Sequence, residues 1–190
     1  MPRTASFNKQ HVLHEAMLVF WEKGYNATSM QDLVDATKLN RSSIYNTFGD
    51  KLSLYREALA AYIKETQVQF AQALENATNS YEAIQLIFES FLPEIYQDSK
   101  GCMSMNCKAE MSEQPNIKQW LESTQEQMLN TFEQLIVVGQ EEGSINNNQS
   151  ARDYAWHVMN TFQGFRMTGI LEKDPKTLKM IIGNGLSILA

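Results

Sequence analysis

Two short helix signals lie back to back between Thr28 and Phe48, with almost no chain to separate them. Thr28 suits the start of the first helix, and Gln31 stands where a capping box needs its partner. Asn40 is a good N-cap residue for the second helix. Beyond it only Ile44 and Phe48 are clearly apolar, and because they are four residues apart, one narrow stripe should be buried. This pair of helices indicates a helix-turn-helix.

The second helix presents more polar groups than core building explains. One cation, several hydroxyls and an amide are left facing outward on a helix that two apolar residues anchor. Such a helix suits entry into the major groove of DNA. A solvated helix face in a bundle without DNA function is the competing interpretation. The candidate DNA contacts are Thr28, Lys38, Asn40, Arg41, Ser42, Ser43, Tyr45, Asn46, Thr47 and Lys51.

The candidate contacts differ in the part of DNA that they suit. Arg41 can bind a guanine edge or a phosphate, and Asn46 can pair with an adenine edge. Ser43 and Tyr45 are better suited to phosphates, and so is Lys51 at the start of the next helix. The sequence therefore predicts contacts that read bases together with contacts that position the protein.

These residues resemble a known family. Leu39–Phe48 resembles the recognition helix of TetR-family transcriptional regulators, and Lys51 and Leu54 match the start of that family's fourth helix. The positions that resemble its first helix and the following turn are Leu13, Ala16, Phe20, Gly24, Tyr25 and Thr28. Lys38 departs from the pattern, because the family usually has glycine there. A positive φ would cost a lysine up to about 1 kcal/mol, and a phosphate contact is another role open to it.

The resemblance implies an organisation and a function. It implies a three-helix DNA-binding domain over residues 1–50 and a helical effector-binding and dimerisation domain over residues 51–190. The two C-terminal helices of each subunit would form a homodimer, which suits a palindromic operator with half-sites about 34–36 Å apart. The expected function is a sequence-specific transcriptional regulator, a repressor released from its operator by a small-molecule effector.

Composition is consistent with an all-α protein. Hydrophobic residues make up 43% of the 190, there are only 4 prolines and 9 glycines, and helical spacing recurs throughout. No apolar run approaches a membrane span, and the N-terminus lacks the apolar core of a signal peptide. Two cysteines and no export signal suggest a reducing cytoplasm. No cofactor, metal or catalytic signature appears, so we do not expect an enzyme.

The net charge of −6 is unevenly distributed. The first 60 residues carry seven basic and six acidic side chains, a net charge of +1, and the rest of the chain carries −7. DNA binding must therefore depend on a local cluster of cations and not on a broadly basic surface. Few phosphate contacts imply a modest salt dependence for each subunit.

The remaining helices follow from apolar spacing and its interruptions. The last two carry broad apolar faces that suit dimerisation, although packing within one subunit would explain them too. The expected helices cover residues 8–23, 50–74, 81–97, 103–112, 117–141, 150–171 and 175–189, besides the helix-turn-helix.

An apolar effector pocket between the middle helices is a second candidate site. Aromatic and methionine side chains could line an adaptable cavity, but a plain core has the same pattern. The candidate lining residues are Phe88, Phe91, Tyr96, Met111, Trp120, Met128, Phe132, Trp156, Met159 and Phe162.

Cys102 and Cys107 form a third candidate site. A helix N-terminus and a nearby Lys100 or Lys108 would lower the pKa of a thiol and favour the reactive thiolate. Soft sulfur ligands would also suit Cu(I). Residues five apart on a helix are roughly 8 Å apart, which disfavours a disulfide. The alternatives left open are a thiol- or copper-responsive repressor, inert core cysteines, and a helical small-molecule-binding protein without DNA function.

Overall fold

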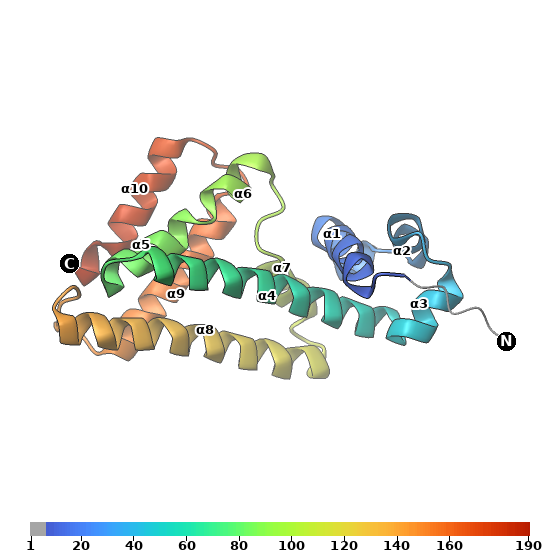
Figure 1. The fold of residues 1–190 in the computed structure, drawn as a ribbon, viewed down its shortest axis with the longest axis horizontal. Helices are drawn as coiled ribbons and strands as arrows, with labels where there is room; N and C mark the ends of the chain where they lie inside the picture. The colour runs from blue at the N-terminus through green and yellow to red at the C-terminus, as the bar shows by residue number, and fades with distance from the viewer. Residues whose placement is uncertain (1–6) are drawn as a thin grey trace. The chain divides into compact units, whose positions relative to one another are not determined.

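The computed structural model describes residues 7–190, and all the regular structure in that range is helical (Figure 1), which confirms the all-α prediction. No helix in that range is long and apolar enough to span a membrane. The helices are α1 (Lys9–Ala27), α2 (Met30–Thr37), α3 (Arg41–Phe48), α4 (Lys51–Asn76), α5 (Ser80–Glu89), α6 (Leu92–Gln97), α7 (Met103–Met111), α8 (Pro115–Glu142), α9 (Ala151–Thr168), α10 (Pro175–Leu186) and the 3-10 turn η1 (Ser187–Leu189).

The chain divides into two compact units inside α4. Unit 1 ends at Thr66 and unit 2 covers Gln67–Ala190. The predicted domain boundary, between residues 50 and 51, lies at the start of α4, whereas the two compact units divide within that helix. The compact units divide later because the early turns of α4 bury apolar side chains such as Leu54 and Tyr55 in unit 1.

The predicted helix over residues 81–97 is wrong as a single helix. α5 ends at Glu89, and α6 begins at Leu92 with Pro93 in its first turn. Proline is tolerated there because it lacks an N–H and the first-turn amides have no partner within the helix. The interruption therefore follows from one residue whose effect the apolar spacing concealed.

Unit 1 buries one side of α1 and then changes direction at Gly24. Asn8 caps α1, since its side-chain oxygen accepts hydrogen bonds from the amides of Gln10 and His11. Gly24 has a φ of 77°, which a residue with a Cβ rarely adopts. Beyond this kink the ring of Tyr25 lies 5.1 Å from that of Tyr55, edge to face. The kink therefore returns an aromatic side chain to the core of unit 1.

The predicted capping box at Thr28 and Gln31 is wrong by one residue. Ser29 caps α2: its Oγ accepts from the amide of Asp32 at 3.1 Å, and the Asp32 carboxylate accepts from the Ser29 amide at 2.8 Å. Thr28 is buried, and its hydroxyl donates to the Gly24 carbonyl at 2.6 Å. Adjacent Thr28 and Ser29 are both good caps by type, so only the tertiary packing of Thr28 decides between them.

The start and the anchor of α3 are as predicted. The Asn40 side-chain oxygen accepts from the amide of Ser43 at 2.8 Å. Ile44 and Phe48 are 1% and 5% exposed. α3 is therefore fixed at its first turn by a cap and along one stripe by two core residues.

Unit 2 is built around Phe162 of α9. Four rings surround it at centroid distances of 5.2 to 6.1 Å, and they are Phe70, Phe88, Phe91 and Phe132. All four pairs meet edge to face, the arrangement that aromatic quadrupoles favour. The cluster therefore joins side chains from α4, α5, α8 and α9 and from the α5–α6 turn into one packed core.

Asn146, in the loop between α8 and α9, holds the end of α10. Its amide nitrogen donates to the carbonyls of Ile188 and Ala190 at 2.8 and 2.9 Å, and its backbone N–H donates to Leu189. The Tyr154 hydroxyl in turn donates to the Asn146 side-chain oxygen. One loop residue thus ties η1 and the last residue of the chain, which follow α10, to the first turn of α9.

The cap of α3 can be tested by unfolding. Replacing Asn40 by alanine should lower the free energy of unfolding of unit 1 by about 1 kcal/mol, because the Ser43 amide loses its acceptor. The measurement is urea unfolding followed by Trp21 fluorescence, in a background where Trp120 and Trp156 are phenylalanine. Asn46→Ala, an exposed change on the same helix, should cost less than about 0.5 kcal/mol. Equal losses for the two variants would contradict the capping role.

Candidate nucleic-acid interface

α3 exposes a polar face with one large aromatic on it. Arg41, Ser42, Tyr45 and Asn46 are exposed, and Tyr45 is 43% exposed. Ser43 and Thr47 are half-buried beside the anchoring stripe. The structure therefore brings these predicted contacts together on one helix, with donors and acceptors of the kinds that bind base edges and phosphates.

The other predicted contacts lie in the connections around α2 and α3. Lys38 is exposed in the turn, whereas the side-chain oxygen of Asn40 is occupied in capping α3. Thr28 is 1% exposed, so the prediction that its side chain contacts DNA is corrected: its hydroxyl belongs to the core of unit 1.

Several cations of unit 1 already have partners. Lys9 pairs with Glu57 at 2.8 Å, and Lys23 pairs with Asp32 at 2.6 Å. The hydrogen bond from Lys23, followed by those from Ser29, holds the pKa of the Asp32 carboxyl well below its ordinary value. Because these two ammonium groups are paired with carboxylates, they are less available to bind DNA phosphates.

Lys51 is held by an aromatic ring instead of a carboxylate. Its Nζ lies 4.4 Å from the centroid of the Tyr25 ring, within cation–π range. Burial, and then the charge of Asp50, raise the pKa of Tyr25, so this phenol stays neutral at physiological pH. The ring orients Lys51, and no carboxylate among residues 7–190 forms an ion pair with its ammonium.

Most of the predicted effector residues form core. Phe88, Phe91, Met111, Phe132, Met159 and Phe162 are no more than 3% exposed. Trp120 and Met128 are half-buried. Trp156 and Tyr96 are 44% and 41% exposed, so the prediction that they line an enclosed pocket is wrong. Each follows a buried residue, Ile95 or Ala155. Apolar spacing alone therefore did not show that these two aromatic side chains lie on the exposed side of their helices.

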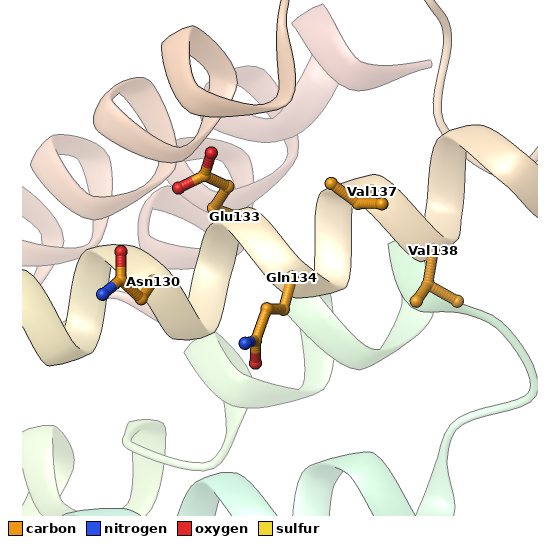
Figure 2. Close-up of a pocket in the computed structure, with 5 residues that line it drawn as sticks. All are labelled: Asn130, Glu133, Gln134, Val137 and Val138. Carbon is orange, nitrogen blue, oxygen red and sulfur yellow. The ribbon is translucent and has the colours of Figure 1, made fainter.

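A hollow of about 660 Å³ lies over α8, away from the predicted pocket residues. Figure 2 shows that its side chains spread around one helix, with Glu133 on one side and Gln134 and Val138 on the other. Val137 and Val138 are 40% and 48% exposed. Side chains that diverge in this way do not enclose a ligand, so we assign no effector to the hollow.

The two cysteines have different surroundings and are not joined by a disulfide. Cys107 is fully buried in α7, whereas Cys102 is half-buried at the N-cap of that helix. Burial lowers the pKa of Lys108, and the charge of Cys102 acts in the opposite direction. Lys108 also donates to Gln125 at 2.8 Å. The thiol at the helix N-terminus is therefore the one with a cation in its vicinity.

A buried ion pair escaped the sequence analysis. Arg166 is 2% exposed, pairs with Glu94 at 2.5 Å, and lies 4.0 Å over the Phe91 ring. Lys173 donates to backbone carbonyls at the ends of two helices, those of Ile95 and Asp98 at α6 and that of Gly169 at α9. Arg166 follows Phe162 by four residues, so helical spacing did place it on the buried face.

Among residues 7–190 no group of three or more His, Cys, Asp or Glu side chains is arranged to hold a metal ion.

Comparison with known proteins identifies the family. The family model of bacterial regulatory proteins of the tetR family matches residues 12–58, and that of the tetracyclin repressor-like C-terminal domain matches residues 82–183. The uncharacterized HTH-type transcriptional regulator YezE of Bacillus subtilis (strain 168) is 28% identical over 153 residues, 79% of either protein. The HTH-type transcriptional repressor DhaR of Mycobacterium sp. (strain GP1) is 25% identical over 176 residues, 92% of this chain and 88% of DhaR.

Solved structures share the fold. A cysteine-substituted form of the TetR-family regulator CifR, complexed with 26-bp operator DNA, has a TM-score of 0.87 at 20% identity and covers 99% of this chain and 100% of its own. The reduced form of E. coli NemR has a TM-score of 0.83 at 15% identity, over 95% of this chain and 97% of NemR. The second family model alone spans more than half of the 190 residues. The chain therefore belongs to the tetR family of bacterial regulatory proteins and is a DNA-binding transcriptional regulator.

Proposed function

We propose that this regulator is a dimeric repressor that places α3 of each subunit in the major groove of a palindromic operator. The observation that carries the proposal is the exposed polar face of α3, held on only two core residues. Relatives support it: DhaR is named a repressor, and CifR is bound to operator DNA in its structure. Such a protein acts in the cytoplasm, where the DNA is.

In this proposal some side chains of α3 contact base edges and others contact phosphates. Arg41 and Asn46 are exposed and carry the groups that read guanine and adenine edges. Tyr45 and the half-buried Ser43 supply hydroxyls for phosphates, and Lys51, oriented by the Tyr25 ring, supplies a charge at the start of α4. Two heads related by two-fold symmetry would double these contacts and explain a palindromic site.

The surfaces of α9 and α10 support the proposed dimer. Trp156 and Met167 of α9 are 44% and 38% exposed, and Met180 of α10 is 55% exposed. A Cβ added at Gly164 or Gly183 would meet no atom within 4 Å, so the backbone is open to close approach at both positions. Exposed large apolar side chains beside open glycines are what a helix-packed interface requires.

Release by an effector would follow from two conformations of the dimer. An effector bound to unit 2 would favour one spacing of the paired heads, and operator DNA would favour the other. By linkage, the effector weakens DNA binding by the same factor as DNA weakens effector binding. The proposal includes no catalytic step.

A thiol-responsive repressor is the second candidate, and the placement of Cys102 favours it. This thiol is half-buried at the N-cap of α7 with Lys108 in its vicinity, so it is more exposed than the fully buried Cys107. Cys107 and Met103 are both fully buried in α7, so Cys102 is the more exposed of the two thiols.

Recognition by α3 is tested with the double variant Arg41→Ala, Tyr45→Ala. Genomic fragments that the wild-type protein retains at physiological salt supply the operator. The double variant should bind it at least about tenfold more weakly, because a base contact and a phosphate contact are lost. Lys64→Ala with Tyr96→Ala removes one exposed cation and one exposed tyrosine outside α3 and should bind normally. Unchanged affinity in the α3 variant would show that Arg41 and Tyr45 do not contact the operator.

The dimer is tested by adding charge to its proposed surface. Trp156→Glu with Met180→Glu should raise the dimer dissociation constant by at least about tenfold, because carboxylates would be buried without partners. Sedimentation equilibrium measures this constant. Val138→Glu, which changes an equally exposed apolar residue on α8, should leave it unchanged. A stable dimer of the double variant would place the interface elsewhere.

The thiol candidate is tested by alkylation. N-ethylmaleimide should modify Cys102 much faster than Cys107 because only Cys102 is accessible, and modification should release operator DNA. Cys107→Ser should respond as the wild type does, and Cys102→Ser should keep its DNA. If Cys102→Ser releases operator as readily as the wild type, this candidate fails.

A further inference from the structure

Lys38 adopts a backbone conformation that disfavours its side chain. Its φ is 59° and ψ is 13°, and it is the non-glycine residue with a positive φ among residues 7–190. Side chains with a Cβ rarely adopt this left-handed region, because the Cβ approaches the following carbonyl oxygen. A strained position of this kind is a reason to look for a function.

The backbone of this turn does not need a lysine. The amide of Lys38 donates to the carbonyl of Val34 at 3.0 Å and so ends α2. Two residues later Asn40 caps α3. Glycine would make the same backbone hydrogen bond and adopt the same φ without strain. What lysine adds is therefore its side chain.

The ammonium of Lys38 is one of the few uncommitted charges near α3. It is exposed and has no hydrogen bond or ion pair within residues 7–190, whereas Lys9 and Lys23 are paired with carboxylates. The nearby Asp35 accepts a hydrogen bond from Gln31 at 2.9 Å. Lys38 and Arg41 thus place two exposed cations on either side of the N-cap of α3, where the amides of the first turn also attract anions.

We propose that Lys38 binds a DNA phosphate beside the groove that α3 enters, and that the strained turn is retained for this contact. The proposal rests on the proposed function, since it assigns a partner to a residue at the same interface. It makes Lys38 a positioning residue, because a phosphate contact carries no base information. The competing role is structural: a cation at the end of α2 also interacts favourably with the helix dipole.

The test compares three substitutions with a control of matched charge. Lys38→Gln removes the charge and keeps the side chain, Lys38→Gly removes both the charge and the strain, and Lys38→Arg keeps the charge. Lys64→Gln removes an exposed charge of unit 1 on α4. Affinity for the selected operator and for a scrambled duplex is measured between 50 and 200 mM salt, together with the melting temperature of each variant.

A phosphate contact has a specific signature. In Lys38→Gln and Lys38→Gly the slope of log affinity against log salt should fall by about 0.9 for each head, while the preference for operator over scrambled DNA is unchanged. Lys38→Gly should melt above the wild type and yet bind DNA more weakly. Lys38→Arg and Lys64→Gln should keep the wild-type slope.

The alternative outcomes separate the two proposals. If the wild type prefers the operator but Lys38→Gln keeps its slope, the phosphate contact is wrong and Lys38 only stabilises the end of α2. If the wild type shows no preference for the selected operator, the proposed function itself is wrong and the contact fails with it.

Discussion

The structure of the DNA-binding unit depends on how little of α3 is buried. Ile44 and Phe48 pack into unit 1, and Asn40 closes the first turn. A helix of eight residues would be marginal in isolation, so these contacts decide whether it forms at all. Because they occupy only one stripe, the remaining side chains can be chosen for DNA. The turn before α3 is short, since only residues 38–40 separate it from α2, and Lys38 adopts the left-handed conformation within this turn.

The features that local chemistry determines were predictable from the sequence. Asn40 as a cap and Ile44 with Phe48 as the anchor follow from residue type and spacing, and the structure confirms them. The cap of α2 was misplaced because Thr28 and Ser29 are chemically equivalent as caps. What distinguishes them is that Thr28 is buried and bonded to Gly24, which is a tertiary contact. A difference of one residue there decides whether a hydroxyl caps α2 or lies in the core of unit 1.

The second unit was less predictable for a physical reason. Apolar spacing reports which face of a helix is buried, but a packed core and a ligand cavity are lined by the same residue types. Phe162 shows the outcome, since four rings fill the space around it. Arg166 shows a further limit: a charge on a buried face is compensated by Glu94, 72 positions earlier in the chain, and no local pattern links the two.

The hydrogen bonds of Asn146 have a consequence for association. They hold the carbonyls of Ile188 and Ala190, and Tyr154 of α9 holds Asn146 in turn. Two helices fastened in this way lose little conformational freedom when another surface packs against them. Affinity between proteins depends strongly on such preorganisation, since ordering an interface opposes binding. In the proposed dimer, the loop before α9 would therefore favour assembly by ordering the C-terminal end of the chain in advance.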